Sequence, residues 1–213
     1  DDGFQHLRLE RDINILLVDA RTGFGNGFLL PRGILREPMS AVKRASITMV
    51  KGDVLEANAA KIINMANTPV MRFAYKPSCL TPLKGGQTLS PASLNGKRVL
   101  AVAGIANPES FFSTLRELNA EIVKTLIFPD HHMYSKADIV KIEALKKASP
   151  AAIGTTAAMI ITTEKDGVKL IRLVDKGLHI HALSIEVSVK DEKEFEEALL
   201  FPREGRCCSR YLK

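Results

Sequence analysis

Residues 98–118 read RVLAVAGIANPESFFSTLREL, and this stretch decides the fold class. Residues 98–103 are almost continuously apolar, which is typical of a strand buried on both faces of a parallel sheet. Asn107 and Pro108 follow as an N-cap and a first-turn proline, and they predict a helix that runs to about Leu118. A strand that leads directly into a helix is the repeating unit of parallel α/β domains.

The same alternation extends in both directions along the chain. Further apolar runs predict strands at residues 13–18, 47–50, 122–128, 159–163 and 178–189. Helix signals predict helices just after Pro38, at 53–65, from Ser135 to about 147, at 164–173 and at 191–200. Strands and helices at this spacing predict parallel α/β layers.

The pattern changes between residues 68 and 95, where four prolines and Gly85-Gly86 interrupt short extended pieces. Such a segment is typical of a linker or hairpin between domains. We therefore divide the chain into an α/β part at 1–67, a linker at 68–95, a small α/β domain at 96–190, and a last helix with a poorly ordered tail at 191–213.

Composition narrows the classes of function. The 213 residues are 46% hydrophobic and 25% charged, which is globular composition, and the net charge of +6 fits an anionic partner. Trp is absent and aromatic residues make up 6%, so we expect no nucleic-acid partner. Cys79, Cys207 and Cys208 give neither a disulfide framework nor a zinc spacing. No apolar run reaches the ~18 residues of a membrane span.

The chain opens on Asp1-Asp2-Gly3-Phe4-Gln5-His6, without Met. Polar, chemically capable residues rarely open a domain, so we expect that further sequence precedes them. At the carboxyl end of a preceding strand, Asp1 and Asp2 would hold Mg²⁺ beside nucleotide phosphates. A solvated turn is the commoner explanation of two adjacent aspartates, while His6 adds a group that titrates near neutral pH.

A glycine loop at residues 23–27 has amides able to approach phosphate oxygens, although a simple turn has the same composition. The chain contains no Gly-x-x-x-x-Gly-Lys-Ser/Thr, so this loop is not a P-loop. Arg36 and Glu37 lie just beyond it, where a salt bridge at a helix start is the structural alternative to a role in binding.

Asp130-His131-His132 follow a predicted strand. At the carboxyl end of a strand, an acid and two imidazoles can act as a general base or hold a metal. A polar loop without function is the alternative. Residues 162–166 stand at another strand-to-helix junction, which fits either anion binding or capping. His179 and His181 alternate on one strand face without a third ligand. Together these residues indicate metal-assisted phosphoryl chemistry and leave kinase and hydrolase both open.

Seven motifs occur in the order found in tetraacyldisaccharide 4′-kinases, the lipid A 4′-kinases of Gram-negative bacteria, and the chain resembles this family over residues 1 to about 170. The motifs are Asp1-Asp2-Gly3-Phe4-Gln5-His6, Arg11-Asp12, Gly25-Asn26-Gly27 with Leu30-Pro31-Arg32-Gly33, Leu35-Arg36-Glu37-Pro38, residues 103–111, Asp130-His131, and Thr162-Thr163-Glu164-Lys165-Asp166. The resemblance implies the C-terminal part of a P-loop-type parallel-sheet domain and a smaller α/β domain, joined by a β-hairpin linker.

The resemblance also implies a reaction. Family members use ATP and Mg²⁺ to phosphorylate the 4′-hydroxyl of a tetraacylated glucosamine disaccharide 1-phosphate at the cytoplasmic face of the bacterial inner membrane. It implies that Asp1 or Asp2 organises Mg²⁺, that Glu37 is a further acidic site residue, and that His131, rather than His132, assists the general base. The substrate or phosphate contacts that it implies are His6, Asn26 and Arg36.

In the family, the P-loop, the main catalytic base and a membrane-touching helix precede the Asp1-Asp2 motif, and these 213 residues contain none of them. We therefore predict that this chain alone has no measurable kinase activity, and that contact with the inner membrane is made by preceding sequence. Two alternatives stay open at this point: a metal-dependent phosphoesterase of the Asp-His-His type, and a non-catalytic basic lipid-binding fragment.

Overall fold

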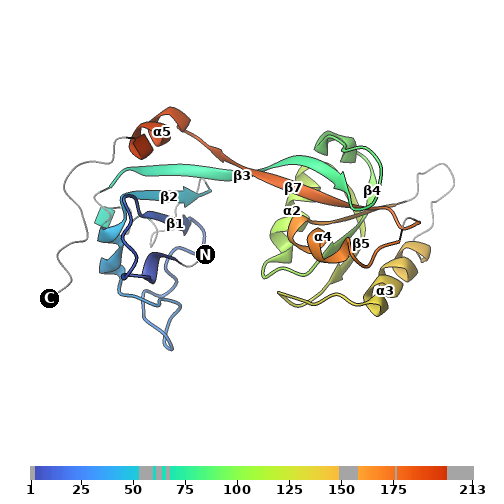
Figure 1. Ribbon diagram of the computed structural model, residues 1–213, viewed down its shortest axis with the longest axis horizontal. Coiled ribbons are helices and arrows are strands. Elements are labelled where there is room, and N and C mark those ends of the chain that lie inside the picture. The colour runs from blue at the N-terminus through green and yellow to red at the C-terminus, as the bar shows by residue number, and fades with distance from the viewer. Residues whose placement is uncertain are drawn as a thin grey trace. The chain divides into compact units, whose positions relative to one another are not determined.

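The computed structural model describes residues 3–52, 60, 64–65, 68–148, 158–175 and 177–200. The chain forms two compact units: unit 1 is Asp1–Tyr75 with Val187–Lys213, and unit 2 is Lys76–Glu186 (Figure 1). Hydrogen-bonded strands follow the order β1-β2-β3-β7-β6-β4-β5. The long strands β3 (Val70–Pro82) and β7 (Ile180–Val189) each contribute residues to both units.

Unit 1 is built on three parallel strands. They are β1 (Ile15–Asp19), β2 (Ile47–Lys51) and the first half of β3, and the register places Ile15 beside Ile47. All four residues from Ile47 to Val50 are buried, so β2 is the inner strand of the three.

The helical elements described in unit 1 are short. They are η1 (Gly3–Gln5) and η2 (Met39–Arg44), both 3₁₀ helices, and α5 (Glu192–Leu200). The core of unit 1 contains Ile47 and Met49 of β2 and Met71 and Phe73 of β3. Packed against them are Ile13, which precedes β1, Val189 of β7, and Phe195, Ala198 and Leu199 of α5. Burial of this apolar surface ties α5 to the sheet of unit 1.

Unit 2 contains a parallel sheet centred on β4 (Arg98–Ala103). Strand β5 (Glu121–Ile127) pairs on one side of β4, while β6 (Met159–Thr163) and then β7 lie on the other. Every residue of β4 from Val99 to Ala103 is buried. Burial on both faces explains the continuous apolar run at this position.

Helices cover both faces of that sheet, and each face has its own core. Helix α2 (Pro108–Glu117) packs on one face with the 3₁₀ helix η3 (Pro91–Leu94). Helices α3 (Lys136–Lys147) and α4 (Glu164–Leu170) pack on the other. Side chains of β4 alternate between the two cores, as the pleat of a strand requires.

Each helix of unit 2 begins at the capping residue that its sequence predicts. Asn107 Oδ1 accepts a hydrogen bond from the Ser110 N–H at 3.3 Å, and Thr163 Oγ1 accepts one from the Asp166 N–H at 3.1 Å. At the start of α3, Asp138 Oδ2 accepts from the Ser135 N–H at 3.0 Å. These bonds satisfy backbone donors that a helix start leaves free.

The predicted α/β class is confirmed, and strands 98–103 and 159–163 have the bounds expected from sequence. Residues 70–82 form one strand rather than several short pieces, because the fixed φ of Pro77 is compatible with extended backbone. The segment after Pro38 is a 3₁₀ helix. Most of the helix expected at 53–65, and the tail from 203 onward, lie outside the described residues.

Residues Val187–Val189 at the end of β7 and helix α5 belong to unit 1. Strand β7 leads back into unit 1, where Phe195 and Leu199 of α5 pack against its core. Composition along the chain did not reveal this return, because it depends on contacts between distant segments. Among the described helices, none is both long and apolar enough to cross a bilayer.

Candidate functional site

The carboxyl ends of the parallel strands of unit 2 bring three motifs to one edge of its sheet. Residues 104–107 follow β4, residues 128–135 follow β5, and α4 follows β6. Ligands bind at this edge in open α/β sheets. The motifs at 103–111, 130–131 and 162–166 are therefore neighbours in space although they are distant in sequence.

His131 is the exposed member of the histidine pair. Its side chain is 80% exposed and its Nε2 lies 3.6 Å from Asp130 Oδ2. Its backbone has a φ of 59°, the left-handed region that non-glycine residues rarely occupy. Backbone strain of this kind costs of order 1–3 kcal/mol and persists where the surroundings impose it, often at functional positions.

Asp130 links this histidine to α4. Its Oδ1 accepts hydrogen bonds from the His131 N–H at 2.9 Å and from Lys165 Nζ at 3.2 Å. Partial burial acts to raise the pKa of Asp130, but the Lys165 ammonium and the His131 N–H outweigh it and hold that pKa below its ordinary value. The carboxylate beside His131 is therefore kept ionised.

His132 has the opposite surroundings. Its ring stacks on Phe128 with centroids 4.6 Å apart, and Tyr134 meets it edge-on at 5.0 Å. Its Nε2 lies 3.1 Å from Oδ2 of the buried Asp138, whose Oδ1 accepts from Lys141 Nζ at 2.9 Å. Hydrogen bonds from Lys141, His132 and Ser135 hold the pKa of Asp138 well below its ordinary range. His132 thus joins the loop to α3.

Helix α4 holds the loop that carries His131 at two points. Lys165 binds Asp130 in front of the histidine, and Lys169 Nζ donates to the His132 carbonyl at 3.2 Å behind it. The two lysines are four residues apart, so they lie on the same face of the helix. The sequence analysis named Lys165 only as a member of the motif at 162–166 and did not name Lys169, which follows that motif.

Asp166 joins α4 to the end of β4. This carboxylate is fully buried, and its Oδ2 accepts from the Gly104 N–H at 2.8 Å and from Thr163 Oγ1 at 2.7 Å. A Cβ on Gly104 would stand 2.8 Å from Tyr134 Oη and 3.1 Å from Asp166 Oδ1. Burial, and then the Asp166 carboxylate, raise the pKa of Tyr134 above its ordinary value. Through these hydrogen bonds the motif at 162–166 caps α4 and links it to the end of β4.

Unit 1 contains the other site residues that the sequence predicts, and one of them, Glu37, has a defined set of contacts. Glu37 forms an ion pair with Arg44, whose guanidinium also lies over the Phe4 ring at 4.8 Å. The structure thus connects Glu37 through Arg44 to the segment that follows Asp1 and Asp2. Both of these aspartates lie outside the described residues.

The expected substrate contacts have different surroundings. His6 is exposed, and its N–H bonds to the Gly3 carbonyl at 3.0 Å. Asn26 Oδ1 accepts from the Phe28 N–H at 3.1 Å while its Nδ2 donates to the Arg32 carbonyl at 2.9 Å, so both polar ends are used within its own loop. Arg36 is exposed immediately before Glu37.

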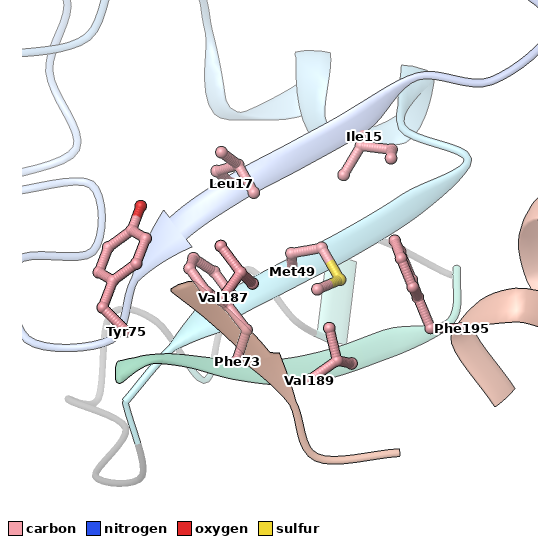
Figure 2. A pocket seen from close by; sticks show the side chains of 8 residues that line it. All are labelled: Ile15, Leu17, Met49, Phe73, Tyr75, Val187, Val189 and Phe195. Carbon is pink, nitrogen blue, oxygen red and sulfur yellow. The ribbon is translucent and has the colours of Figure 1, made fainter. Parts of the chain in front are cut away.

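Unit 1 also contains an apolar hollow of about 320 Å³ that the sequence analysis did not predict. Figure 2 shows side chains of β1, β2, β3, β7 and α5 around one space. They are Ile15, Leu17, Met49, Phe73, Tyr75, Val187, Val189 and Phe195. The signal was the period of two in β1, where Ile15 and Leu17 share a face. A lining of this kind supports apolar contact and offers no acid or base for catalysis.

Within the part of the chain that the structure describes, no three His, Cys, Asp or Glu residues come together as metal ligands. Of the two histidines at 179 and 181, only His181 lies within β7. Burial, and then the neighbouring His179, lower the pKa of His181.

Comparisons with known proteins agree on one family. The family described as Tetraacyldisaccharide-1-P 4'-kinase matches residues 1–201. The tetraacyldisaccharide 4'-kinase of Syntrophus aciditrophicus is 42% identical over 213 residues, with 94% of this chain and 55% of the relative covered. That of Geobacter metallireducens is 37% identical over 200 residues, with 93% and 56% covered.

A solved structure supports the fold. The crystal structure of LpxK from Aquifex aeolicus, an "apo" form in complex with ATP, superposes with a TM-score of 0.62 at 24% identity and covers 93% of this chain and 55% of that one. The chain thus spans about half the length of the relatives that it matches. No comparison supports a phosphoesterase. A match from residue 1 to residue 201, together with relatives of this identity, shows that the chain belongs to the tetraacyldisaccharide 4′-kinase family.

Proposed function

We propose that this chain serves the ATP-dependent phosphorylation of the 4′-hydroxyl of a tetraacylated glucosamine disaccharide 1-phosphate in lipid A biosynthesis. The observation that carries the proposal is the family match over residues 1–201. The proposed place of action is the cytoplasmic face of the inner membrane, where a lipid acceptor of this kind is accessible to a peripheral enzyme.

His131 is the residue of unit 2 that we assign to this reaction, as an assistant to the general base. Its exposed ring and its position beside the ionised Asp130 support the assignment, because a carboxylate next to an imidazole orients the ring. His132 does not suit the role, since Phe128 and Asp138 already engage its ring.

The remaining roles belong to unit 1. We propose that Asp1 and Asp2 hold Mg²⁺ and that Glu37 is a further acidic residue of the site. His6, Asn26 and Arg36 would contact substrate, and Asn26 also shapes its loop through its hydrogen bonds with Phe28 and Arg32. Among the described residues no three His, Cys, Asp or Glu side chains come together as metal ligands, and the sequence has no Gly-x-x-x-x-Gly-Lys-Ser/Thr.

The first test measures this chain alone. The purified 213-residue protein is incubated with γ-labelled ATP, Mg²⁺ and the tetraacyldisaccharide 1-phosphate acceptor. We expect no labelled lipid, because the groups that cradle the β- and γ-phosphates are not among these residues. Labelled lipid would refute the expectation that nucleotide binding needs further sequence.

The second test asks whether these residues serve the reaction. Residues 1–201 replace the matching part of the Syntrophus aciditrophicus relative, and the chimaera is assayed with the same substrates. We expect phosphoryl transfer, a loss of about 10²–10⁴ in kcat for His131→Ala, and little change for the matched exposed variant His179→Ala. A folded chimaera without activity, or full activity in His131→Ala, would contradict the proposal.

A further inference from the structure

Residues 26–36, which we call the Leu30 loop, turn their large apolar side chains toward solvent. Leu30 and Ile34 are 61% and 62% exposed, and Phe28 and Leu29 are exposed beside them. Figure 1 shows this part of the chain extending away from the strands of unit 1. A contiguous exposed group of this size indicates a surface that contacts something apolar.

The Leu30 loop has a defined shape of its own. The Leu30 N–H donates to the Leu35 carbonyl at 2.8 Å, and the Leu35 N–H donates to the Phe28 carbonyl at 3.2 Å. Asn26 bonds both sides of the loop, as described above. A side chain at Gly33 would stand 2.1 Å from the Phe28 carbonyl oxygen, so only glycine fits. Polar groups are therefore satisfied inside the loop while apolar ones face outward, the reverse of an ordinary surface loop.

The charge around these apolar side chains has one sign. Residues 20–36 contain Arg21, Arg32 and Arg36 and no acidic residue. Arg32 lies over the Phe28 ring, 3.9 Å from its centroid, so a guanidinium stands at the apolar tip. Of the flanking acids, Asp19 accepts a hydrogen bond from the Arg21 backbone N–H at 2.9 Å and lies 3.7 Å from Lys51 Nζ, and Glu37 pairs with Arg44.

We propose that the Leu30 loop is a membrane-docking element that inserts into the interface of an anionic lipid bilayer. Its apolar tip would enter the boundary between headgroups and acyl chains while Arg21 and Arg32 bind lipid phosphates. The proposal rests on the proposed function in that the acceptor is a membrane lipid, and it places membrane contact within this chain rather than only in preceding sequence. Charge complementarity selects anionic bilayers over an apolar protein surface.

The test is sedimentation of the 213-residue protein with phosphatidylcholine vesicles that contain or lack phosphatidylglycerol, at about 0.1 M and about 0.5 M salt. We expect binding to the anionic vesicles only, weaker at high salt. Leu30→Ser with Ile34→Ser should lower the partition coefficient about tenfold. Arg21→Ala with Arg32→Ala should lower it about fivefold per arginine, and Arg32→Lys should retain most binding.

The control carries matched changes on unit 2, Val168→Ser with Arg172→Ala, at an exposed valine and an exposed arginine. It should bind vesicles as the unaltered chain does, and circular dichroism checks that every variant is folded. Equal binding to neutral and anionic vesicles, unchanged binding in both loop variants, an equal loss in the control, or binding to detergent-dispersed lipid but not to bilayers would each overturn the proposal. The assay needs no ATP, so its failure leaves phosphoryl transfer untouched, and failure of transfer leaves vesicle binding measurable.

Discussion

His131 and His132 are adjacent in sequence, yet one imidazole is exposed and the other is packed between aromatic rings. Identical side chains have different surroundings here: His131 has left-handed backbone and an exposed ring. His132 instead stacks on Phe128 and reaches Asp138. The sequence motif identifies both histidines as candidate site residues, and the structure shows that only one of them is exposed.

The lowered pKa of Asp138 predicts how the unfolding free energy of unit 2 changes at acid pH. Its pKa is lowered from an ordinary value of 3.8 by Lys141, His132 and Ser135. The unfolded chain therefore binds more protons at this residue, so its stabilising effect is present above about pH 4 and is lost as the pH falls through the lowered pKa. We expect Asp138→Asn to flatten the loss of stability below about pH 4, measured by urea unfolding at several pH values.

The control for that experiment is Asp175→Asn, an exposed aspartate of the same unit. It should leave the pH dependence of the unfolding free energy as it is. An Asp138→Asn protein that loses stability on acidification as steeply as the unaltered chain would contradict the assignment.

A side chain at Gly104 is expected to crowd Tyr134 and the buried Asp166. Gly104→Ala would place a methyl group 2.8 Å from Tyr134 Oη, so we expect a loss of about 1–3 kcal/mol in unfolding free energy. Adding Tyr134→Phe removes the hydroxyl and should restore part of that loss. Gly177→Ala is the matched control, since no atom lies within 4 Å of its Cβ position. Chemical denaturation measures all three, and equal effects at Gly104 and Gly177 would refute the crowding.

At the scale of elements, α4 is a short helix that carries out two tasks. Its N-cap region binds the end of β4 through Asp166, and its lysines hold the loop after β5. Each lysine contact is exposed or half-buried, and such contacts add little to global stability. Their effect is local, because they restrict the loop that presents His131.

The local effect gives a prediction for hydrogen exchange. Lys165→Ala with Lys169→Ala should speed amide exchange of residues 128–134 about tenfold, with a change in global unfolding free energy within about 1 kcal/mol. Mass spectrometry of deuterated peptides measures the exchange. Lys147→Ala on α3 is the matched control, and it should leave the loop unchanged. Unaltered exchange in the α4 variant would show that the lysines do not hold the loop.

At the scale of the molecule, unit 2 has both sheet faces covered while unit 1 leaves an apolar hollow open (Figure 2). Leu17 is 64% exposed within a parallel strand whose neighbour β2 is buried. The hollow and the Leu30 loop are different surfaces of unit 1, since no residue of the loop lines the hollow.

The hollow should bind an apolar dye. We expect 8-anilinonaphthalene sulfonate to fluoresce with this chain, and Leu17→Ser with Val187→Ser to lower that fluorescence by about half, with stability changed by no more than about 0.5 kcal/mol. Val140→Ser, an exposed valine on α3, serves as the control and should change neither quantity. If the double variant kept the full signal, the dye would bind another surface.

By itself the sequence determined the α/β class, the starts of α2, α3 and α4, and the family. These depend on local information: apolar runs fix strands, and side chains within three residues cap a helix. The seven ordered motifs identify the family for the same reason, since each is a short continuous stretch of sequence.

Only the tertiary structure decided that His131 is exposed, that α4 braces its loop, that β7 returns the chain to unit 1, and that the Leu30 loop faces outward. Gly104 and Asp166 are 62 residues apart, and Asp130 and Lys165 are 35 apart. Contacts across such separations form only when strands pair and helices pack. Periodicity and capping act over a few residues, so they cannot specify which distant side chains meet.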